Sequence, residues 1–118
     1  MTRKQTVTVK QKNRIFIVDD HPIVRRGLAQ LINQEDDLVI CGEADYAEAA
    51  IEALKKVKTD LAIVDTAPHS DNVAAIAAQF ADFVLIPCRP ARFDLKAIGS
   101  TAQIAKLAKT RAAVVINA

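Results

Sequence analysis

The stretch "RIFIVDD" (residues 14–20) is a continuous apolar run that ends in two acids. This pattern is expected for a strand buried on both faces of a parallel sheet. Pro22 suits the first turn of a helix, where its missing N–H is not needed. Apolar residues then recur at close to helical spacing, which predicts a helix to about Asn33 with one buried stripe: Ile23, Leu28, Leu31 and Ile32.

The alternation of apolar runs and helical patterns continues to the end of the sequence. Further strands are predicted at 38–44, 61–65, 82–88 and 112–118, and helices at 46–58, 71–80 and 92–110. Strands alternating with helices imply right-handed crossovers and a parallel sheet. We therefore expect an α/β chain with a flavodoxin-like, doubly wound, five-stranded parallel sheet in the order 2-1-3-4-5.

No residues remain after the fifth strand to form the last helix of such a fold. Part of one sheet face should then be apolar and uncovered. An uncovered face of this kind favours a homodimer that buries it against a second copy.

Composition excludes several classes of protein. The chain has 118 residues, of which 51% are hydrophobic and 25% charged, as in a single globular domain. A net charge of +2 does not favour nucleic-acid binding, and no apolar run approaches the roughly 18 residues of a membrane span. Cys41 and Cys88 lie in apolar runs, as reduced thiols of a cytoplasmic protein would. Residues 1–13 are basic without an apolar segment and predict a flexible tail rather than a signal peptide.

Three acids are expected to meet at one edge of the sheet. Asp19 and Asp20 end the first strand and Asp65 ends the third. If these strands are neighbours, the carboxylates converge, and a hard cation such as Mg²⁺ would relieve their repulsion. Asp65 is then a candidate nucleophile for a phosphoryl group. The alternative is that Asp20 merely caps the following helix and that Asp65 caps a turn.

Other chemistries have less support. The glycines are Gly27, Gly42 and Gly99, so no P-loop is present, and we expect neither a bound nucleotide nor ATPase activity. His21 and His69 are isolated in sequence, and a zinc site is not expected.

Residues 14–65 resemble the receiver domain of response regulators, in particular the NarL-like branch. The segments that carry the resemblance are "VDDHPIVRRGL", "LVICGEADYAEAAIEALKK" and "DLAIVD". The resemblance implies that Asp19 and Asp20 belong to an acidic metal pocket, that Asp65 is the phosphoacceptor and that a histidine kinase is the partner. The sequence departs from that family after Asp65, where "TAPHSDN" replaces the usual "xxMPxxxG". The Ser or Thr expected after the fourth strand and the Lys expected after the fifth are also replaced, by "IPCRP" and "INA".

Residues 61–118 instead resemble the later part of a ParA-type partition ATPase, through "AIVDTAPHSDN", "ADFVLIPCRPARFDLKAI" and "AAVVINA". This resemblance implies that Asp65 lies near the Mg²⁺ of a nucleotide and that Asn117 lies near its adenine. The P-loop on which that activity depends is absent.

The two resemblances together lead to an expectation of a recombined, engineered chimera. Residues 14–118 would form one hybrid domain, receiver-like over 14–65 and ParA-like over 66–118. It would be a scaffold without catalytic turnover and with at most weak Mg²⁺ binding at Asp19, Asp20 and Asp65. One alternative is a receiver phosphorylated on Asp65. A second is a weak nucleotide-binding module that uses Arg89 and Asn117.

Overall fold

The computed structural model describes residues 10–65, 71–90 and 92–116. The chain divides into two compact units, Met1–Asp65 and Thr66–Ala118, which are considered separately. The single domain expected over residues 14–118 stays a prediction. So does the flexible tail of residues 1–13, of which only residues 10–13 are described.

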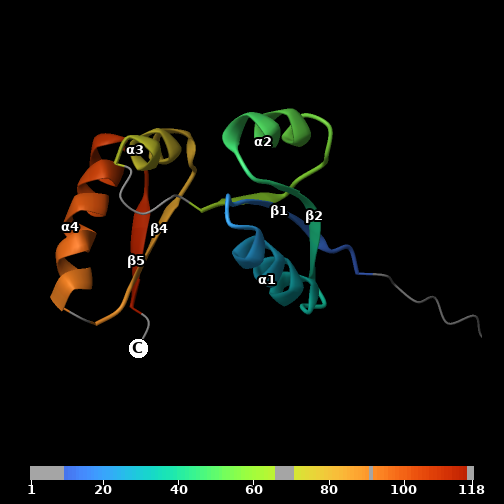
Figure 1. Cartoon of the computed structure of the whole chain (residues 1–118), viewed down its shortest axis with the longest axis horizontal. Coiled ribbons are helices and arrows are strands. Elements are labelled where there is room, and N and C mark those ends of the chain that lie inside the picture. The colour runs from blue at the N-terminus through green and yellow to red at the C-terminus, as the bar shows by residue number, and fades with distance from the viewer. Residues whose placement is uncertain (1–9, 66–70, 91, 117–118) are drawn as a thin grey trace, which may run out of the picture. The chain divides into compact units, whose positions relative to one another are not determined.

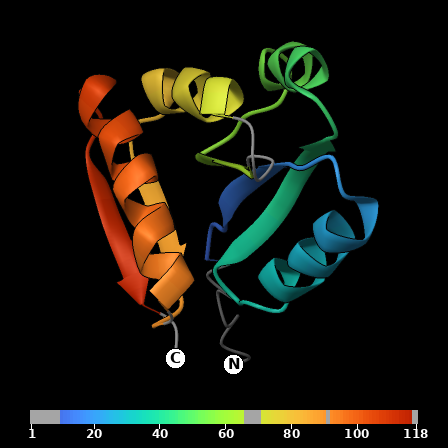
Figure 2. The same ribbon diagram turned by 60° about the vertical axis from the view of Figure 1, so that its left-hand side comes forward.

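The first unit is a three-stranded parallel sheet with a helix on each face (Figures 1 and 2). Its strands are β1 (Asn13–Val18), β2 (Leu38–Ala44) and β3 (Leu61–Val64), in the order β2-β1-β3. The helices are α1 (Pro22–Asn33) and α2 (Ala47–Leu54). The sequence predicts these five elements to within a few residues, except that α2 ends four residues before the expected Lys58.

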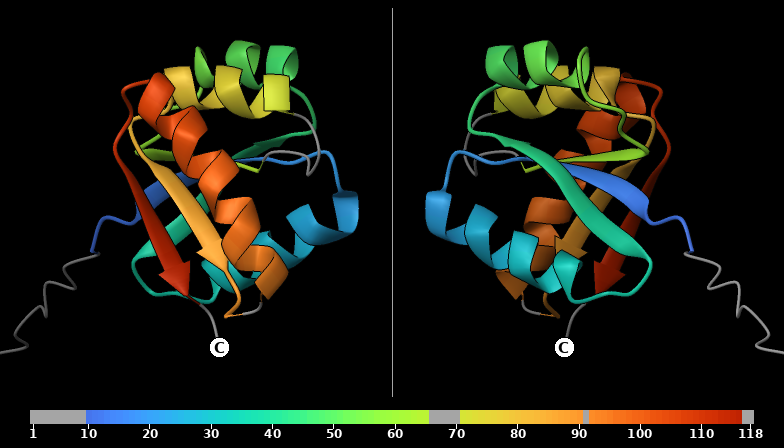
Figure 3. Two further views of the ribbon diagram at one scale, coloured as in Figure 1. Left: turned by 90° about the vertical axis from the view of Figure 1, so that its left-hand side faces the viewer. Right: turned by 90° about the vertical axis from the view of Figure 1, so that its right-hand side faces the viewer.

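The second unit pairs two parallel strands, β4 (Val84–Cys88) and β5 (Ala112–Ile116). Helix α4 (Arg92–Leu107) lies across one face of this pair, and α3 (Asp71–Phe80) packs against α4 (Figure 3). Alternating residues of β4 are buried under the helix, as expected for a strand with one covered face. In the described part of the chain no helix has both the length and the apolar character that a membrane span requires.

The five-stranded sheet expected from the sequence is not confirmed. The order 2-1-3 is present in the first unit, but β4 and β5 form a separate two-stranded sheet. Apolar runs predict where strands form, whereas pairing depends on which strand edges come together in space. Strand β3 is also short, with four residues, and offers few hydrogen bonds to a further neighbour.

The core of the first unit lies between the sheet and α2. Phe16 and Val18 of β1 are buried there with Ala44 and Ala50. The predicted buried stripe of α1 is wrong in part, because Ile23 and Leu31 are 86% and 62% exposed and no residue of α1 is fully buried. Leu28 and Ile32 are half-buried instead, and α1 packs chiefly on β2.

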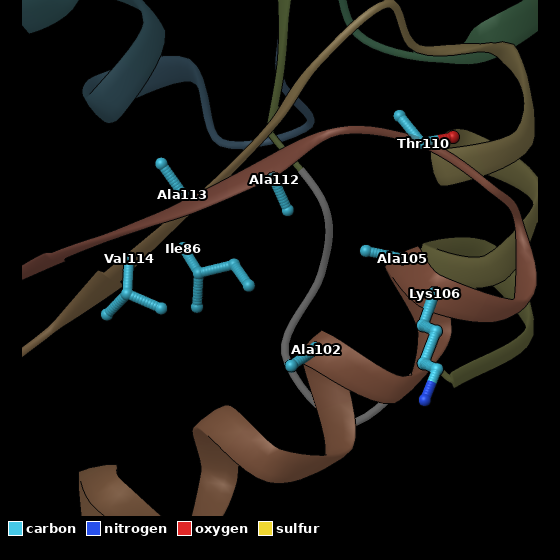
Figure 4. Close-up of a pocket in the computed structure, with 8 residues that line it drawn as sticks. All are labelled: Ile86, Ala102, Ala105, Lys106, Thr110, Ala112, Ala113 and Val114. Carbon is cyan, nitrogen blue, oxygen red and sulfur yellow. The ribbon is translucent and has the colours of Figure 1, made fainter.

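A shallow cavity of about 250 Å³ lies between α4 and the β4–β5 pair in the second unit (Figure 4). Its lining is mostly alanine and aliphatic, with Lys106 and Thr110 as its polar residues. The Thr110 hydroxyl already donates to the carbonyl oxygen of Ala78 at 2.5 Å. The cavity therefore offers few polar groups to orient a ligand.

Gly42 permits the close approach of β2 to the ring of Phe16. The β1–β2 register slips by one residue between Ile15 and Phe16, so that Ile15 faces Ile40 and Phe16 faces Gly42. A Cβ atom at position 42 would lie 2.6 Å from Cε2 of Phe16, a ring that is only 1% exposed. The buried ring has little room to move away, so glycine is required here by packing.

We predict that Gly42→Ala lowers the free energy of unfolding by about 1–3 kcal/mol, because the added methyl overpacks the core. Gly27→Ala in α1 is the matched control, since a Cβ there meets nothing within 4 Å. Alanine in a helix interior should raise stability by about 0.5–1 kcal/mol. Urea denaturation of both variants measures the two effects, and equal stabilities would contradict the packing argument.

Candidate functional site

Strand pairing brings two of the three predicted acids to the same edge of the first sheet. Asp19 directly follows β1, and its N–H donates to the carbonyl oxygen of Ala44 in β2 at 3.0 Å. Asp65 directly follows β3, and its N–H donates to the carbonyl oxygen of Val18 at 3.0 Å. The ladder hydrogen bonds thus fix both backbones at the carboxyl end of the sheet, where ligands of parallel α/β proteins bind.

Asp19 is the buried acid of the site. The residue is 1% exposed. Its Oδ1 atom accepts a hydrogen bond from the N–H of His21 at 2.8 Å and lies 3.1 Å from the Nδ1 atom of the same histidine. Its Oδ2 atom is buried and has no hydrogen-bond partner in the part of the chain that the structure describes. Such an atom destabilises the fold by about 1–3 kcal/mol unless a ligand satisfies it.

His21 joins the two neighbouring acids. Its Nδ1 atom lies 2.8 Å from Oδ1 of Asp20 as well as 3.1 Å from Oδ1 of Asp19. The side chains of His21 and Asp20 are both more than half exposed, unlike that of Asp19. His21 is the N-cap residue of α1 through its backbone, and no side chain caps the helix. The alternative role of Asp20 as a side-chain cap is therefore not found.

The position of Asp65 affects its protonation. Partial burial raises the pKa of the Asp65 carboxyl above its ordinary value, and the neighbouring charge of Asp19 raises it further. The charge of His21 opposes this shift of the Asp65 pKa, while a hydrogen bond with the Asp19 side chain and the charge of Asp20 add to it. Because the Asp65 side chain is exposed, its loss of hydration is small. The charge of Asp19 is therefore the main cause of the raised pKa of Asp65.

The arrangement fits a bound cation. One ligand atom from each of Asp19, His21 and Asp65 can be chosen so that all three lie within 4.8 Å of one another. The unpartnered, buried Oδ2 atom of Asp19 and the raised pKa of Asp65 both indicate negative charge without full compensation. Carboxylate oxygens are the donors that Mg²⁺ prefers. The predicted proximity of Asp19 and Asp65 is confirmed, while the role of Asp20 as a direct metal ligand stays a prediction.

Sequence reasoning missed His21 and Arg25. His21 is not isolated, as its contacts with both acids show, and the signal was its position directly after the acidic pair. Arg25 lies one helical turn further on, and its Nη1 atom donates to the carbonyl oxygen of Asp19 at 2.6 Å. Its Nε atom is also 4.0 Å from a carboxylate oxygen of Glu43 on β2. Arg25 thus ties the start of α1 to the ends of two strands.

The predicted nucleotide residues belong to the second unit. Arg89 follows β4 and is exposed, and its carbonyl oxygen accepts a hydrogen bond from the thiol of Cys88 at 3.0 Å. Asn117 lies outside the described residues. A nucleotide-binding role for these two residues stays a prediction.

Comparison with known proteins shows which family the first unit resembles. Residues 15–71 match the family model of the response regulator receiver domain. The chain is 34% identical over 71 residues to an uncharacterized transcriptional regulatory protein, YhcZ, of Bacillus subtilis, covering 59% of this chain and 33% of that protein. It is 39% identical over 51 residues to the nitrate/nitrite response regulator protein NarL of Escherichia coli, covering 43% of this chain and 24% of that protein. The chain therefore spans a third or less of these curated relatives.

These matches confirm the receiver resemblance and correct the expected function. The expectation of a chimeric scaffold is wrong, because the matching family and the similar proteins are response regulators and transcriptional regulators. The matches give no support to a fusion with a ParA-type ATPase. The physical reason is that short apolar strands ending in an acid, followed by alanine-rich helices, recur throughout parallel α/β proteins. Such segments specify a fold class and not a family.

We predict that Asp65→Asn raises the free energy of unfolding of the metal-free protein at pH 7 by up to about 1 kcal/mol. The gain is small because the Asp65 side chain is exposed. Folding raises the pKa of Asp65, so its contribution to stability is present below the unfolded pKa and lost as pH rises through the folded pKa. Asparagine does not ionise, so the variant does not lose this stability as pH rises. Urea denaturation in EDTA should show the advantage of the variant shrinking as pH falls toward 3.8, and a less stable variant at pH 7 would contradict the argument.

Proposed function

From the receiver-domain match of residues 15–71, we propose that the chain is a phosphoacceptor in two-component signalling. In this proposal Asp65 accepts a phosphoryl group from a histidine kinase or from a small phosphodonor. The observation that supports it is the placement of Asp65 at the end of β3, with a carboxylate oxygen of the buried Asp19 within 4.8 Å of its own.

The exposed side chain of Asp65 is suited to act as the nucleophile. One of its oxygens bonds to phosphorus while the bond from phosphorus to the donor nitrogen or oxygen breaks. The leaving group keeps that electron pair, and a phosphohistidine donor regains a neutral imidazole on taking up a proton. When bound, Mg²⁺ supplies positive charge that offsets the carboxylates and the oxygens of the phosphoryl group.

The buried Asp19 lies beside this nucleophile. The N–H of His21 holds the Asp19 carboxylate, and the guanidinium of Arg25 holds the backbone carbonyl oxygen of Asp19, so the side chain is oriented before any ligand arrives. We propose that Asp19, Asp20 and Asp65 form the acidic pocket that holds Mg²⁺. The chain would accept a phosphoryl group in this role and would not turn over ATP. The similar proteins, named as a transcriptional regulatory protein and as a nitrate/nitrite response regulator, are far longer than this chain, and their activities are not carried over to it.

We predict that incubation with acetyl phosphate and Mg²⁺ adds one phosphoryl group to the chain, and that Asp65→Asn abolishes the addition. Asp82→Asn, in the other unit, is the matched control and should be phosphorylated like the wild type. Intact-mass spectrometry measures the added group, and circular dichroism verifies that all three proteins are folded. A folded wild type that gains no mass with either this donor or a phosphorylated kinase would overturn the proposal.

We also propose that the uncovered part of the first sheet forms a homodimer. Strand β3 pairs on one edge with β1, and among the described strands none pairs with its other edge. Leu61 and Val64 of β3 are each 54% exposed, which is unusual for apolar residues of a parallel strand. A second copy would bury this apolar surface.

Light scattering should give twice the chain mass of 12.8 kDa at high concentration. Leu61→Lys should lower this value toward one chain, because a charge would be buried in the interface. Lys56→Ala, a change at an exposed position just after α2, serves as the control. A mass of one chain at every concentration would contradict the dimer.

A further inference from the structure

The acidic pocket contains a nitrogen donor beside its oxygen donors. A ring nitrogen of His21 and carboxylate oxygens of Asp19 and Asp65 lie within 4.8 Å of one another. The His21 side chain is 56% exposed, so the ring has room to turn within the pocket. The Oδ1 atom of Asp20 lies 2.8 Å from Nδ1 of His21.

The buried Asp19 carboxylate distinguishes this group from an ordinary surface cluster of acids. Its side chain is fully buried, yet its Oδ2 atom has no partner among the described residues. The other oxygen is already held by His21. A fixed, dehydrated oxygen with a free lone pair is a preorganised metal ligand, whereas exposed acids would first have to be ordered.

The identity of the donors decides which cation fits. Oxygen-only sites suit Mg²⁺, while an imidazole nitrogen favours divalent first-row transition ions. The Nδ1 atom of His21 lies 3.1 Å from Oδ1 of Asp19 and 2.8 Å from Oδ1 of Asp20, so a cation bound to this nitrogen would replace the proton that it shares with these acids.

We propose that His21 is a metal ligand of this pocket and that Asp19, His21 and Asp65 bind a divalent transition ion in preference to Mg²⁺. Asp20, with its Oδ1 atom 2.8 Å from Nδ1 of His21, belongs to the set that holds Mg²⁺ and lies beside the transition-ion ligands. This inference deepens the proposed receiver function, because it concerns the metal of the same pocket. It implies that transition ions compete with Mg²⁺ for the site that supports phosphorylation.

Calorimetric titration of the untagged chain with Ni²⁺ and with Mg²⁺ tests this assignment. The wild type should bind Ni²⁺ at least about tenfold more tightly than Mg²⁺. His21→Ala should weaken Ni²⁺ binding at least about tenfold and change Mg²⁺ binding by no more than about twofold, since even an outer partner of a ligand contributes about 10- to 100-fold. His21→Gln, which keeps the size of the side chain without an imidazole, should behave like His21→Ala.

Two controls make the result specific to the pocket. His69→Ala removes the other histidine of the chain and should leave both affinities unchanged. Asp65→Asn should weaken the binding of both ions. The backbone N–H of His21 that holds Asp19 is retained in every variant of position 21, and circular dichroism verifies folding.

The outcomes separate the inference from the receiver function. Unchanged Ni²⁺ binding in His21→Ala, or a loss caused by His69→Ala instead, overturns the inference. Intact mass after treatment with acetyl phosphate and Mg²⁺ is measured on the same samples. If the wild type is not phosphorylated but its Ni²⁺ binding depends on His21, the receiver function fails and the inference stands. If the wild type is phosphorylated and His21→Ala does not change Ni²⁺ binding, the receiver function stands and the inference fails.

Discussion

Burial of the Asp19 carboxyl group is the constraint around which the first unit is built. A carboxyl group withdrawn from water must find partners inside the protein, and Asp19 finds them for only one of its two oxygens. In the turn between β1 and α1, the backbone N–H of His21 donates a hydrogen bond to the Asp19 carboxylate. Arg25 of α1 donates a hydrogen bond from its guanidinium to the backbone carbonyl oxygen of Asp19. The unsatisfied oxygen remains as a local cost to stability that a cation would remove.

This constraint explains why α1 differs from α2. Helix α2 contributes the buried Ala50 to a core with Phe16 and Val18. Helix α1 buries no residue fully, and its clearest attachment is polar, through Arg25 to Asp19 and toward Glu43. Helix α1 is therefore tied to the end of the strand that carries the acid, and it packs on β2 through half-buried residues such as Leu28 and Ile32.

Repulsion between the acids of the pocket lowers the stability of the metal-free protein and favours the binding of a cation. The raised pKa of Asp65 means that its charge is unfavourable beside Asp19 when no cation is present. A site that is destabilised in this way binds a cation more readily, because neutralising the acids removes the repulsion. The second unit has no comparable group among its described residues, and its cavity is lined mostly by apolar side chains.

The sequence by itself determined the positions of the strands and helices. Their signals are local: apolar runs such as residues 14–18, a proline at the first turn of α1 and acids at strand ends. It also placed Asp19 and Asp65 at one sheet edge, because neighbouring parallel strands end together. The second resemblance, over residues 61–118, has no support from the comparisons, and its strands and alanine-rich helices are common to many α/β proteins.

Only the tertiary structure decided strand pairing, the burial of Asp19 and the role of His21. Pairing depends on which edges meet, and the structure shows three strands paired in the first unit and two in the second. Asp19 and Asp20 are adjacent in sequence, yet Asp19 is buried and Asp20 is exposed, a difference that the identical residue type does not contain. The contacts of the His21 ring with both acids follow from the sharp turn into α1, a three-dimensional relation that spacing along the chain does not contain.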